Sequence, residues 1–379
     1  MMKSLTVLGS TGSVGTQTLE VARQNGYRVC ALSAGRNVSL AEKQAREFMP
    51  DTVAMADENA AKELRSRLRD TDIRVLSGED GIMEAAAEPS ADIAVCAIVG
   101  VAGLKPALAA IKAKKTVALA NKETLVTAGS IVKKAARENG VKIIPVDSEH
   151  SAIFQSLQGA PEGSLRKIIL TASGGPFYGM TREQLLNVTA ADALRHPNWT
   201  MGKKITIDCA TLMNKGFEVM EAVHLFDVAP CDVEVLIHRQ SILHSAVEFC
   251  DGAVIGQMGT PDMKLPIQYA ITYPERKEAY SRLDLATIGS LTFAKPDTET
   301  FECLPLCIEA IEKGGLYPAA LNGANEETVR LFLDGRIRFT DIATLNREAA
   351  FSIENKTDFD LDDVFEADSA AREYIKEHA

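Results

Sequence analysis

Short apolar runs alternate with amphipathic segments over the first 146 residues of the chain. The amphipathic segments, such as Ser39–Phe48 and Thr124–Asn139, carry apolar residues at the spacing of a helix. Strands and helices that alternate in this way are typical of a doubly wound parallel sheet. We therefore predict an α/β fold that begins with a Rossmann-like domain. Its expected strands are Leu5–Leu8, Arg28–Ser33, Thr52–Met55, Arg74–Leu76, Ile93–Ala97, Thr116–Ala120 and Val141–Ile144.

The pattern changes after residue 146. Strands are expected at Lys167–Thr171, Lys204–Asp208, Val233–Ile237, Ser245–Phe249 and Val254–Met258, the last three antiparallel. Those three also offer a surface through which two copies could pair. Residues 269–298 carry few regular signals. Amphipathic helices follow at Phe301–Lys313, Tyr317–Asp334, Thr340–Ile353 and Leu361–His378. The predicted division is a Rossmann-like domain (1–146), a central α+β domain (147–268), a linker (269–298) and a C-terminal α-helical domain (299–379).

Composition narrows the class of protein. The formal net charge of −11 argues against nucleic-acid binding, because that role needs a positive face. The seven cysteines are scattered without a C-x-x-C pair, which is typical of reduced thiols in a cytoplasm. The most apolar run, Ile93–Leu104, is too short to span a bilayer, and the first strand begins too close to Met1 for a signal peptide. We expect a cytoplasmic protein without a membrane partner.

A glycine-rich turn follows the first expected strand and reads Gly9-Ser10-Thr11-Gly12-Ser13-Val14-Gly15. Such a turn lets the backbone approach a pyrophosphate and places that anion on a helix N-terminus, where N–H groups are unpaired. The spacing is G-x-x-G-x-x-G, not the commoner G-x-G-x-x-G. Its place at the start of an alternating α/β pattern favours a dinucleotide site.

The end of the second expected strand indicates which dinucleotide. NAD enzymes usually carry an acid there for the ribose 2′-hydroxyl, but this chain reads Ala34-Gly35-Arg36-Asn37. Arg36 is placed to meet a 2′-phosphate, which favours NADPH. The alternative is an ordinary surface arginine in a loop.

Two carboxylates follow the last strand of the alternating region, in Pro145-Val146-Asp147-Ser148-Glu149-His150. In an extended chain, residues i and i+2 share a face, so we expect Asp147 and Glu149 to lie side by side. Adjacent carboxylates suit a hard divalent cation such as Mg²⁺ or Mn²⁺. The alternative is a solvated acidic turn.

Two further polar clusters carry candidate chemistry. Asn121-Lys122-Glu123 follows the sixth strand, at the edge where open α/β sheets bind ligands, although ordinary helix starts also look like this. Asn214, Lys215 and Glu218 share one helix face. They are either a surface ion pair or, if they face the two carboxylates, a third metal ligand in Glu218 and a cation for substrate in Lys215.

Two loops of the central region have the composition of ligand-binding loops. Ala172-Ser173-Gly174-Gly175-Pro176 could bind a phosphate through Ser173 and backbone amides. His196-Pro197-Asn198-Trp199-Thr200-Met201-Gly202 contains the only tryptophan of the chain and suits a flap over a ligand. A core position for Trp199 is the alternative.

Together these motifs resemble the 1-deoxy-D-xylulose 5-phosphate reductoisomerase family over essentially the whole chain. The matching stretches are GSTGSVG (9–15), AGRN (34–37), ANKE (120–123), PVDSEH (145–150), ASGGPF (172–177), HPNWTMG (196–202), ATLMNKGFE (210–218), GTPDM (259–263) and ALNGANE (320–326). The resemblance implies NADPH- and Mg²⁺- or Mn²⁺-dependent conversion of a keto-sugar phosphate to 2-C-methyl-D-erythritol 4-phosphate, a step of non-mevalonate isoprenoid synthesis. It also implies a homodimer.

The resemblance assigns roles to individual positions. Those implied to bind NADPH are Thr11, Gly12, Ser13, Val14, Gly35, Arg36, Asn37, Asn121, Glu123 and Gly202. Those implied to hold the metal are Asp147, Glu149 and Glu218. Those implied to contact the substrate are Lys122, Ser148, Glu149, Ser173, His196, Cys209, Asn214, Lys215 and Glu218. Lys122 and Glu149 are the candidates for proton transfer.

One position departs from the family pattern. Cys209 stands where the family normally has a serine that touches the phosphate, and a thiol is the weaker hydrogen-bond donor. We therefore expect somewhat weaker phosphate binding. Two other functions are compatible with parts of the sequence. One is a different NADPH-dependent oxidoreductase, such as a semialdehyde or homoserine dehydrogenase, and the other is a non-catalytic NADPH sensor.

Overall fold

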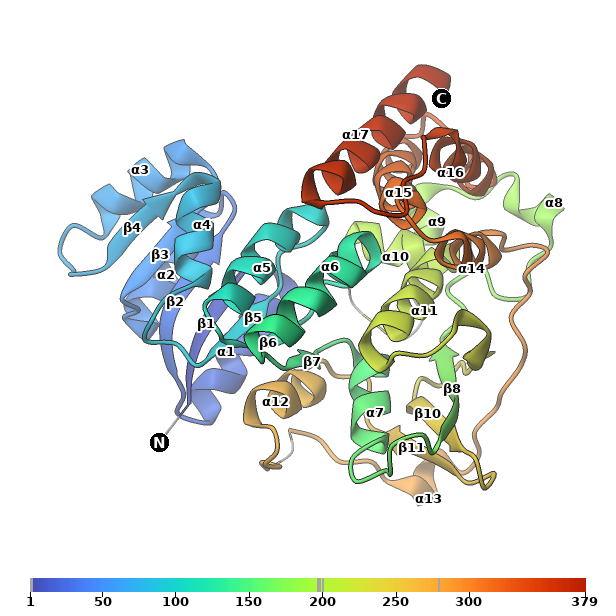
Figure 1. Cartoon of the computed structure of the whole chain (residues 1–379), viewed down its shortest axis with the longest axis horizontal. Coiled ribbons are helices and arrows are strands. Elements are labelled where there is room, and N and C mark those ends of the chain that lie inside the picture. The colour runs from blue at the N-terminus through green and yellow to red at the C-terminus, as the bar shows by residue number, and fades with distance from the viewer. Residues whose placement is uncertain (1–2, 196–198, 200, 279) are drawn as a thin grey trace. The chain divides into compact units, whose positions relative to one another are not determined.

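The computed structural model describes residues 3–195, 199, 201–278 and 280–379 (Figure 1). The chain forms two compact units. The first comprises Met1–Thr124, Val132–Ser151 and Asp262–Tyr280, and the second comprises Leu125–Ile131, Ala152–Pro261 and Ser281–Ala379. The finer division predicted from the sequence, into 1–146, 147–268, 269–298 and 299–379, stays a prediction.

The first unit contains a parallel sheet with the strand order β4-β3-β2-β1-β5-β6-β7. Its strands are β1 Ser4–Leu8, β2 Arg28–Ala34, β3 Thr52–Met55, β4 Arg74–Ser77, β5 Ile93–Cys96, β6 Thr116–Leu119 and β7 Ile143–Pro145. The predicted Rossmann-like sheet is confirmed. Strands buried on both faces read as continuous apolar runs, which is why they could be found in the sequence.

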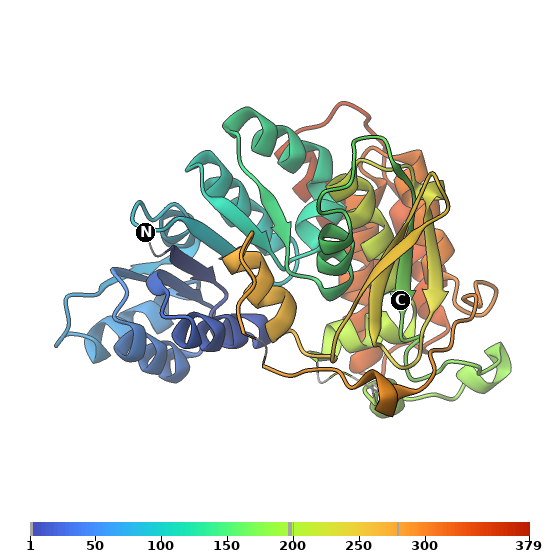
Figure 2. The same cartoon turned by 90° about the horizontal axis from the view of Figure 1, so that it is seen from below.

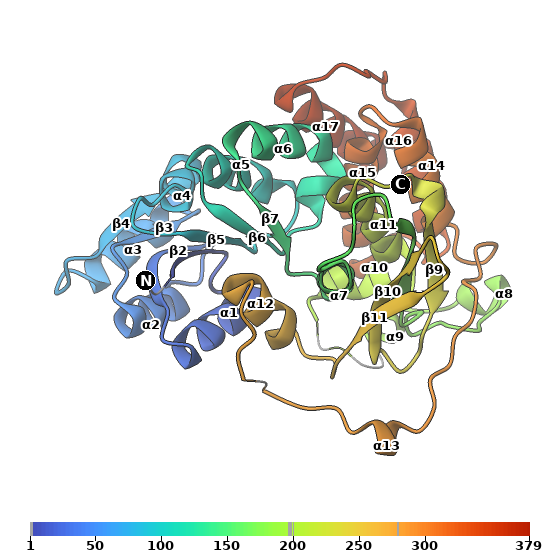
Figure 3. The same ribbon diagram turned by 60° about the horizontal axis from the view of Figure 1, so that its bottom comes forward.

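Helices cover both faces of this sheet. They are α1 Ser13–Gln24, α2 Val38–Phe48, α3 Glu58–Arg67, α4 Gly78–Ala86, η1 Val101–Gly103, α5 Leu104–Lys112, α6 Glu123–Asn139 and α12 Lys264–Thr272. Figure 3 shows α1, α2 and α12 on one face and α4 and α5 on the other. The helix α12 packs on α1, where Lys264 Nζ lies 2.7 Å from Glu20 Oε2. It extends four residues into the segment 269–298, for which few regular elements were expected.

The second unit contains a smaller sheet, in the order β11-β10-β8-β9. Its strands are β8 Leu165–Ala172, β9 Val233–Ile237, β10 Leu243–Phe249 and β11 Val254–Met258. Figure 2 shows β10 and β11 side by side as an antiparallel pair, as predicted. The antiparallel prediction was wrong for β9, which pairs in parallel with β8. The reason is the helical connection between β8 and β9, which returns the chain in its original direction.

The helices of the second unit pack around a large apolar cluster that includes Phe217, Leu304 and Leu321. They are α7 Ser148–Ser156, which begins in the first unit, α8 Arg182–Leu185, α9 Ala190–Ala193, α10 Lys203–Ala210, α11 Met213–Phe226, η2 Pro230–Asp232, α13 Leu285–Ile288, α14 Cys303–Lys313, α15 Tyr317–Leu333, α16 Asp341–Ser352 and α17 Leu361–His378. The four C-terminal helices are confirmed within two residues at each end. Among the described residues, no helix combines the length and apolar character needed to cross a membrane.

The strand predicted at Lys204–Asp208 is wrong, because these residues lie in α10. Their alternating polar and apolar side chains imitate the period of a strand. In the fold, Lys204 Nζ pairs with Asp208 Oδ2 at 2.9 Å, one helical turn away. Asp208 also accepts a hydrogen bond from Asn325 Nδ2 of α15 at 2.8 Å. Tertiary packing has therefore overridden the local strand signal.

Candidate active site

The glycine-rich turn connects β1 to α1 and leaves the helix N-terminus open. A Cβ on Gly9 would lie 2.6 Å from the carbonyl oxygen of Ala97, and one on Gly15 would lie 2.2 Å from the oxygen of Gly9, so neither position tolerates a side chain. The N-cap residue of α1 is Gly12, which supplies no side chain to the first N–H groups. An anion is the natural partner for an uncapped helix N-terminus.

The loop after β2 presents a cation to solvent. The side chain of Arg36 is 86% exposed, and its Nε lies 3.1 Å from Asp57 Oδ2. Asn37 caps α2 by accepting a hydrogen bond from Leu40 N at 3.1 Å. The contact with Asp57 was not predicted, and it holds the arginine near the end of β2.

Asn121 is buried at the carboxyl end of the first sheet, where its side chain bonds to two segments of the backbone. Its Nδ2 donates to the backbone oxygens of Ile98 and Gly100, the latter at 2.8 Å, and its Oδ1 accepts from Thr124 N at 3.0 Å. The side chain thus joins the loop after β5 to the start of α6. Glu123, two residues later in the sequence, is also buried.

Asp147 lies at the centre of a charged cluster after β7. Its Oδ2 accepts from Lys122 Nζ at 2.9 Å, and its Oδ1 lies 3.2 Å from His150 Nδ1. Lys122 and His150 are both buried. The cluster therefore combines a carboxylate, an ammonium and an imidazole. The contact of His150 with Asp147 was not predicted. Residues three apart lie close together in a helix, whereas an extended chain was expected here.

The extended geometry predicted for Asp147 and Glu149 is wrong. The strand stops at Pro145 and α7 starts at Ser148, so Glu149 lies in the first helical turn. Asp147 Oδ1 instead accepts from Glu149 N at 3.2 Å, which makes Asp147 the cap of the helix. Ser148 Oγ donates to the Glu149 carboxylate. The chain starts a helix here and does not continue the strand, because the Asp147 carboxylate satisfies an N–H of the first helical turn that would otherwise be unpaired.

A second charged cluster lies on α11 in the other unit. Asn214 Nδ2 and Lys215 Nζ both donate to the carboxylate of Glu218. The side chains of Lys215 and Glu218 are only 4% and 1% exposed, which excludes the surface ion pair considered above. A shared helix face was predicted correctly. Two donors converging on one buried carboxylate form a site with local charge balance.

The loop Ala172–Pro176 packs against the end of α10. Gly174 and Gly175 have φ angles of +77° and +69°, a conformation that favours glycine. A Cβ on Gly175 would lie 2.6 Å from the Cys209 carbonyl oxygen. The Ser173 hydroxyl accepts from Gly175 N at 3.3 Å. Ser173 and Cys209 therefore belong to two adjoining backbone segments.

The predicted flap lies mostly outside the described residues, which omit His196, Pro197, Asn198 and Thr200. Trp199 is half-buried, and its ring centroid lies 6.3 Å from that of His244. Gly202 is exposed and is the N-cap of α10.

His244 provides a pH-dependent prediction of stability. Burial lowers the pKa of His244 to about 4, although hydrogen bonding to the Thr260 backbone opposes the effect. An unfolded histidine has a pKa of about 6.5, so the unfolded chain binds more protons below that pH. The free energy of unfolding should then fall by up to about 3 kcal/mol between about pH 6.5 and 4.

Denaturant unfolding across this range, compared with His244→Gln, measures that contribution. Glutamine does not titrate, so the variant should lose less stability over the same interval. Parallel pH profiles for the two proteins would contradict the assignment to His244.

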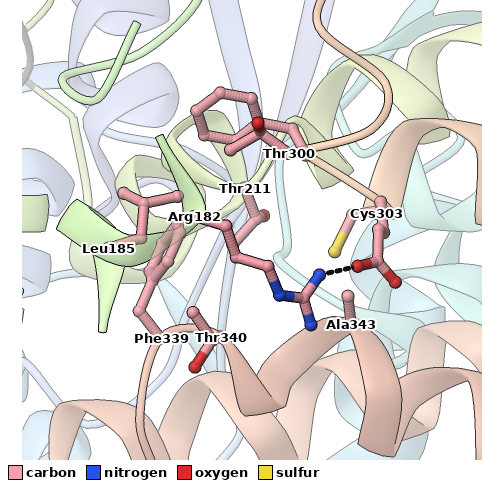
Figure 4. Close-up of a pocket in the computed structure, with 10 residues that line it drawn as sticks. Arg182, Leu185, Thr211, Thr300, Cys303, Phe339, Thr340 and Ala343 are labelled. Carbon is pink, nitrogen blue, oxygen red and sulfur yellow. Dashed lines mark hydrogen bonds and ion pairs between the residues drawn. The ribbon is translucent and has the colours of Figure 1, made fainter. Parts of the chain in front are cut away.

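A small pocket of the second unit is lined by α8, by Thr211 from the turn between α10 and α11, and by residues around the starts of α14 and α16 (Figure 4). Phe301, Phe339 and Cys303 line it, as do Arg182 and Glu302, which form an ion pair. None of the predicted cofactor, metal or substrate residues lines it. The pocket therefore shares no lining residue with either charged cluster.

Models of one family match most of the chain. A 1-deoxy-D-xylulose 5-phosphate reductoisomerase model matches residues 5–129, a C-terminal domain model of that enzyme matches 143–226, and a DXP reductoisomerase C-terminal domain model matches 258–374. The Agathobacter rectalis protein of that name is 54% identical over 379 residues, which cover 99% of each chain. The Acetivibrio thermocellus protein is also 54% identical, over 100% of this chain and 99% of its own.

Solved structures agree. The reductoisomerase of Zymomonas mobilis in complex with NADPH has a TM-score of 0.94 at 41% identity, over 100% of this chain and 99% of that one. A DOX-P reductoisomerase with NADPH, fosmidomycin and magnesium has a TM-score of 0.93 at 39% identity, over 99% and 98%. Family models agree over most of the chain, and relatives and solved structures agree over nearly all of it, so the chain belongs to the 1-deoxy-D-xylulose 5-phosphate reductoisomerase family.

Proposed function

We propose that this chain converts 1-deoxy-D-xylulose 5-phosphate to 2-C-methyl-D-erythritol 4-phosphate, with NADPH and Mg²⁺ or Mn²⁺. The observation that carries the proposal is the buried Asn214–Lys215–Glu218 cluster, because a simple dehydrogenase has no need of it. The relatives named above bear this enzyme's name, and solved members hold NADPH and magnesium. The chemistry belongs to the non-mevalonate route to isoprenoid precursors.

For the cofactor, we propose that the open N-terminus of α1 receives the pyrophosphate. The residues proposed for this site are Thr11, Gly12, Ser13, Val14, Gly35, Arg36, Asn37, Asn121, Glu123 and Gly202. Bound NADPH would supply the hydride. Because the Asn121 side chain already bonds to backbone groups, its proposed role is to shape the loop after β5.

For the metal, we propose Asp147, Glu149 and Glu218 as ligands. Carboxylate oxygens are the donors that Mg²⁺ and Mn²⁺ prefer, and two of these carboxylates already have an ammonium within their own cluster, Lys122 and Lys215. A bound divalent ion would polarise the keto group of the substrate.

For the substrate, we propose contacts from both charged clusters and from the loop at Ser173. The residues are Lys122, Ser148, Glu149, Ser173, His196, Cys209, Asn214, Lys215 and Glu218. Lys215 would meet an anionic oxygen and Asn214 would orient a hydroxyl. Lys122 and Glu149 would hold and move protons while the carbon skeleton rearranges.

Turnover with the purified chain tests the proposal. NADPH oxidation is followed after adding 1-deoxy-D-xylulose 5-phosphate, first in chelator and then with Mn²⁺ or Mg²⁺ restored. Turnover that requires the ion supports the proposal. Equal rates in chelator would favour another NADPH-dependent oxidoreductase, and NADPH binding without any turnover would favour a sensor.

Replacement of Arg36 should change cofactor preference. In Arg36→Gln the 2′-phosphate loses a charged partner, so we expect the KM for NADPH to rise roughly tenfold to a hundredfold while the KM for NADH changes little. Steady-state kinetics with both cofactors measure the ratio. An unchanged ratio would return Arg36 to the role of a surface arginine paired with Asp57.

Restoring a serine at position 209 should tighten substrate binding. The Cys209→Ser variant gains a stronger hydrogen-bond donor, so we expect its KM for the sugar phosphate to fall by roughly twofold to fivefold with kcat preserved. An identical KM would mean that the side chain at this position does not contact the phosphate.

We also propose that two copies of the chain pair through the sheet of the second unit. The outer strand β11 exposes Val254, Ile255 and Met258, and an apolar strand at a sheet edge invites pairing. Sedimentation should therefore give a dimer for the native chain and a monomer for Ile255→Lys. A dimer that survives this charge would exclude the β11 edge as the interface. The cytoplasmic location stays a prediction.

A further inference from the structure

Arg239, just after β9, reaches the loop Ala172–Pro176 and bonds to its backbone. Its Nη1 donates to the carbonyl oxygens of Ser173 and Gly175, each at 2.6 Å. Its guanidinium also lies over the ring of Tyr178, 5.1 Å from the centroid. One side chain thus bonds to the loop at two points and also lies over the ring of Tyr178, two residues beyond the loop.

The base from which Arg239 projects is itself fixed. His238 Nδ1 lies 2.9 Å from Thr292 O, and its Nε2 accepts from Ile242 N and Leu243 N at 3.1 and 3.2 Å. Accepting at Nε2 requires the neutral ring with its proton on Nδ1. Hydrogen bonds from both ring nitrogens of His238 therefore hold the connection between β9 and β10 in place. The backbone of the neighbouring Arg239 is fixed with it.

The two bonds set the orientation of a loop amide. In a trans peptide the N–H points opposite the C=O, so directing the Ser173 carbonyl at Arg239 turns the Gly174 N–H to the other side of the loop. The far end of the loop lies against the Cys209 carbonyl, where Gly175 has no room for a Cβ. The loop is held between the guanidinium and the end of α10.

We infer that Arg239 is a positioning residue for the phosphate of the substrate. It fixes the Ser173 hydroxyl and the Gly174 amide as a preformed anion site, and its charge favours an anion there. The inference rests on the proposed function, in which Ser173 meets the phosphate. The ligand chemistry required is a phosphate dianion, whether carried by a sugar or free in solution.

Three variants test this inference. Arg239→Gln removes the charge and shortens the reach. Arg239→Lys keeps the charge. Because a single nitrogen of Arg239 makes both bonds to the carbonyl oxygens, the single lysine nitrogen can form the same two bonds. Arg166→Gln is the matched control, since Arg166 is on β8 of the same sheet, is mostly exposed and pairs with Glu248. Inorganic phosphate is the probe, and its protection of each protein against thermal unfolding is titrated.

We expect Arg239→Gln to need roughly tenfold to fiftyfold more phosphate for half-maximal protection, and to raise the KM for the sugar phosphate by a similar factor with a smaller change in kcat. Arg239→Lys should recover most of this loss, and Arg166→Gln should match the native chain.

Phosphate protection in Arg239→Gln within twofold of the native chain, or no protection of the native chain at all, would overturn the inference. Failure of the proposed function looks different, because phosphate would still protect a native chain that does not turn over the sugar phosphate.

Discussion

Glu218→Gln should lose turnover by at least about a thousandfold and lose its response to added metal, while NADPH binds as before. In the native chain the Glu218 carboxylate accepts from both Asn214 and Lys215 in a buried setting. The substitution removes a proposed metal ligand and leaves the Lys215 ammonium without that countercharge. Stopped-flow turnover and titration with Mn²⁺ measure the loss.

The same change should cost stability, up to about 3–5 kcal/mol for a broken buried ion pair. Glu218→Asp is the second variant, because it keeps the charge and should fold while binding metal less tightly. Glu327→Gln is the matched control, since Glu327 is also buried and pairs with Arg330 Nη2 at 2.6 Å on α15. It should lose stability and keep turnover. Full turnover in a folded Glu218→Gln would remove Glu218 from the site.

Glu149→Gln should lower kcat by about a hundredfold to ten-thousandfold with an unchanged Kd for NADPH. Glu149 is half-buried at the first turn of α7, so the change in stability should be small. Glutamine keeps the shape of the side chain but can neither take up a proton nor neutralise a cation. Single-turnover kinetics and NADPH titration separate the two effects.

Glu162→Gln, in an exposed loop, provides the control for loss of a carboxylate at a distance. A sensor that only binds NADPH would tolerate Glu149→Gln as well as it tolerates the control. Equal turnover in the two variants would remove Glu149 from the catalytic residues, whereas NADPH binding without turnover in both variants and in the native chain would argue for the sensor.

The first sheet could be predicted from the sequence because its central strands are mostly apolar runs buried on both faces, and local composition alone identifies such runs. The α10 helix could not, since the alternation of Lys204 to Asp208 fits a strand equally well. Whether this segment forms a helix or a strand depends on the contact of Asp208 with Asn325, which is 117 residues away in the chain. The parallel pairing of β9 likewise depends on the whole connection from β8.

Among the candidate site residues, too, local arrangements could be predicted and contacts between distant parts of the chain could not. The shared face of Asn214, Lys215 and Glu218 could be predicted because helical spacing is local. The helical start at Ser148 was missed, and with it the contact of His150 with Asp147. Arg239 was missed because its partners at Ser173 and Gly175 are 66 and 64 residues away. Only the folded second unit brings that guanidinium to the loop.

The carbon skeleton of the product tests the central proposal most directly. The native chain is incubated with 1-deoxy-D-xylulose 5-phosphate, NADPH and Mn²⁺, and the product is analysed by carbon NMR. We predict a branched skeleton, 2-C-methyl-D-erythritol 4-phosphate, formed in equal amount to the NADPH oxidised. A straight-chain polyol phosphate formed at the same stoichiometry would show simple ketone reduction, and would contradict the isomerisation that both charged clusters are proposed to support.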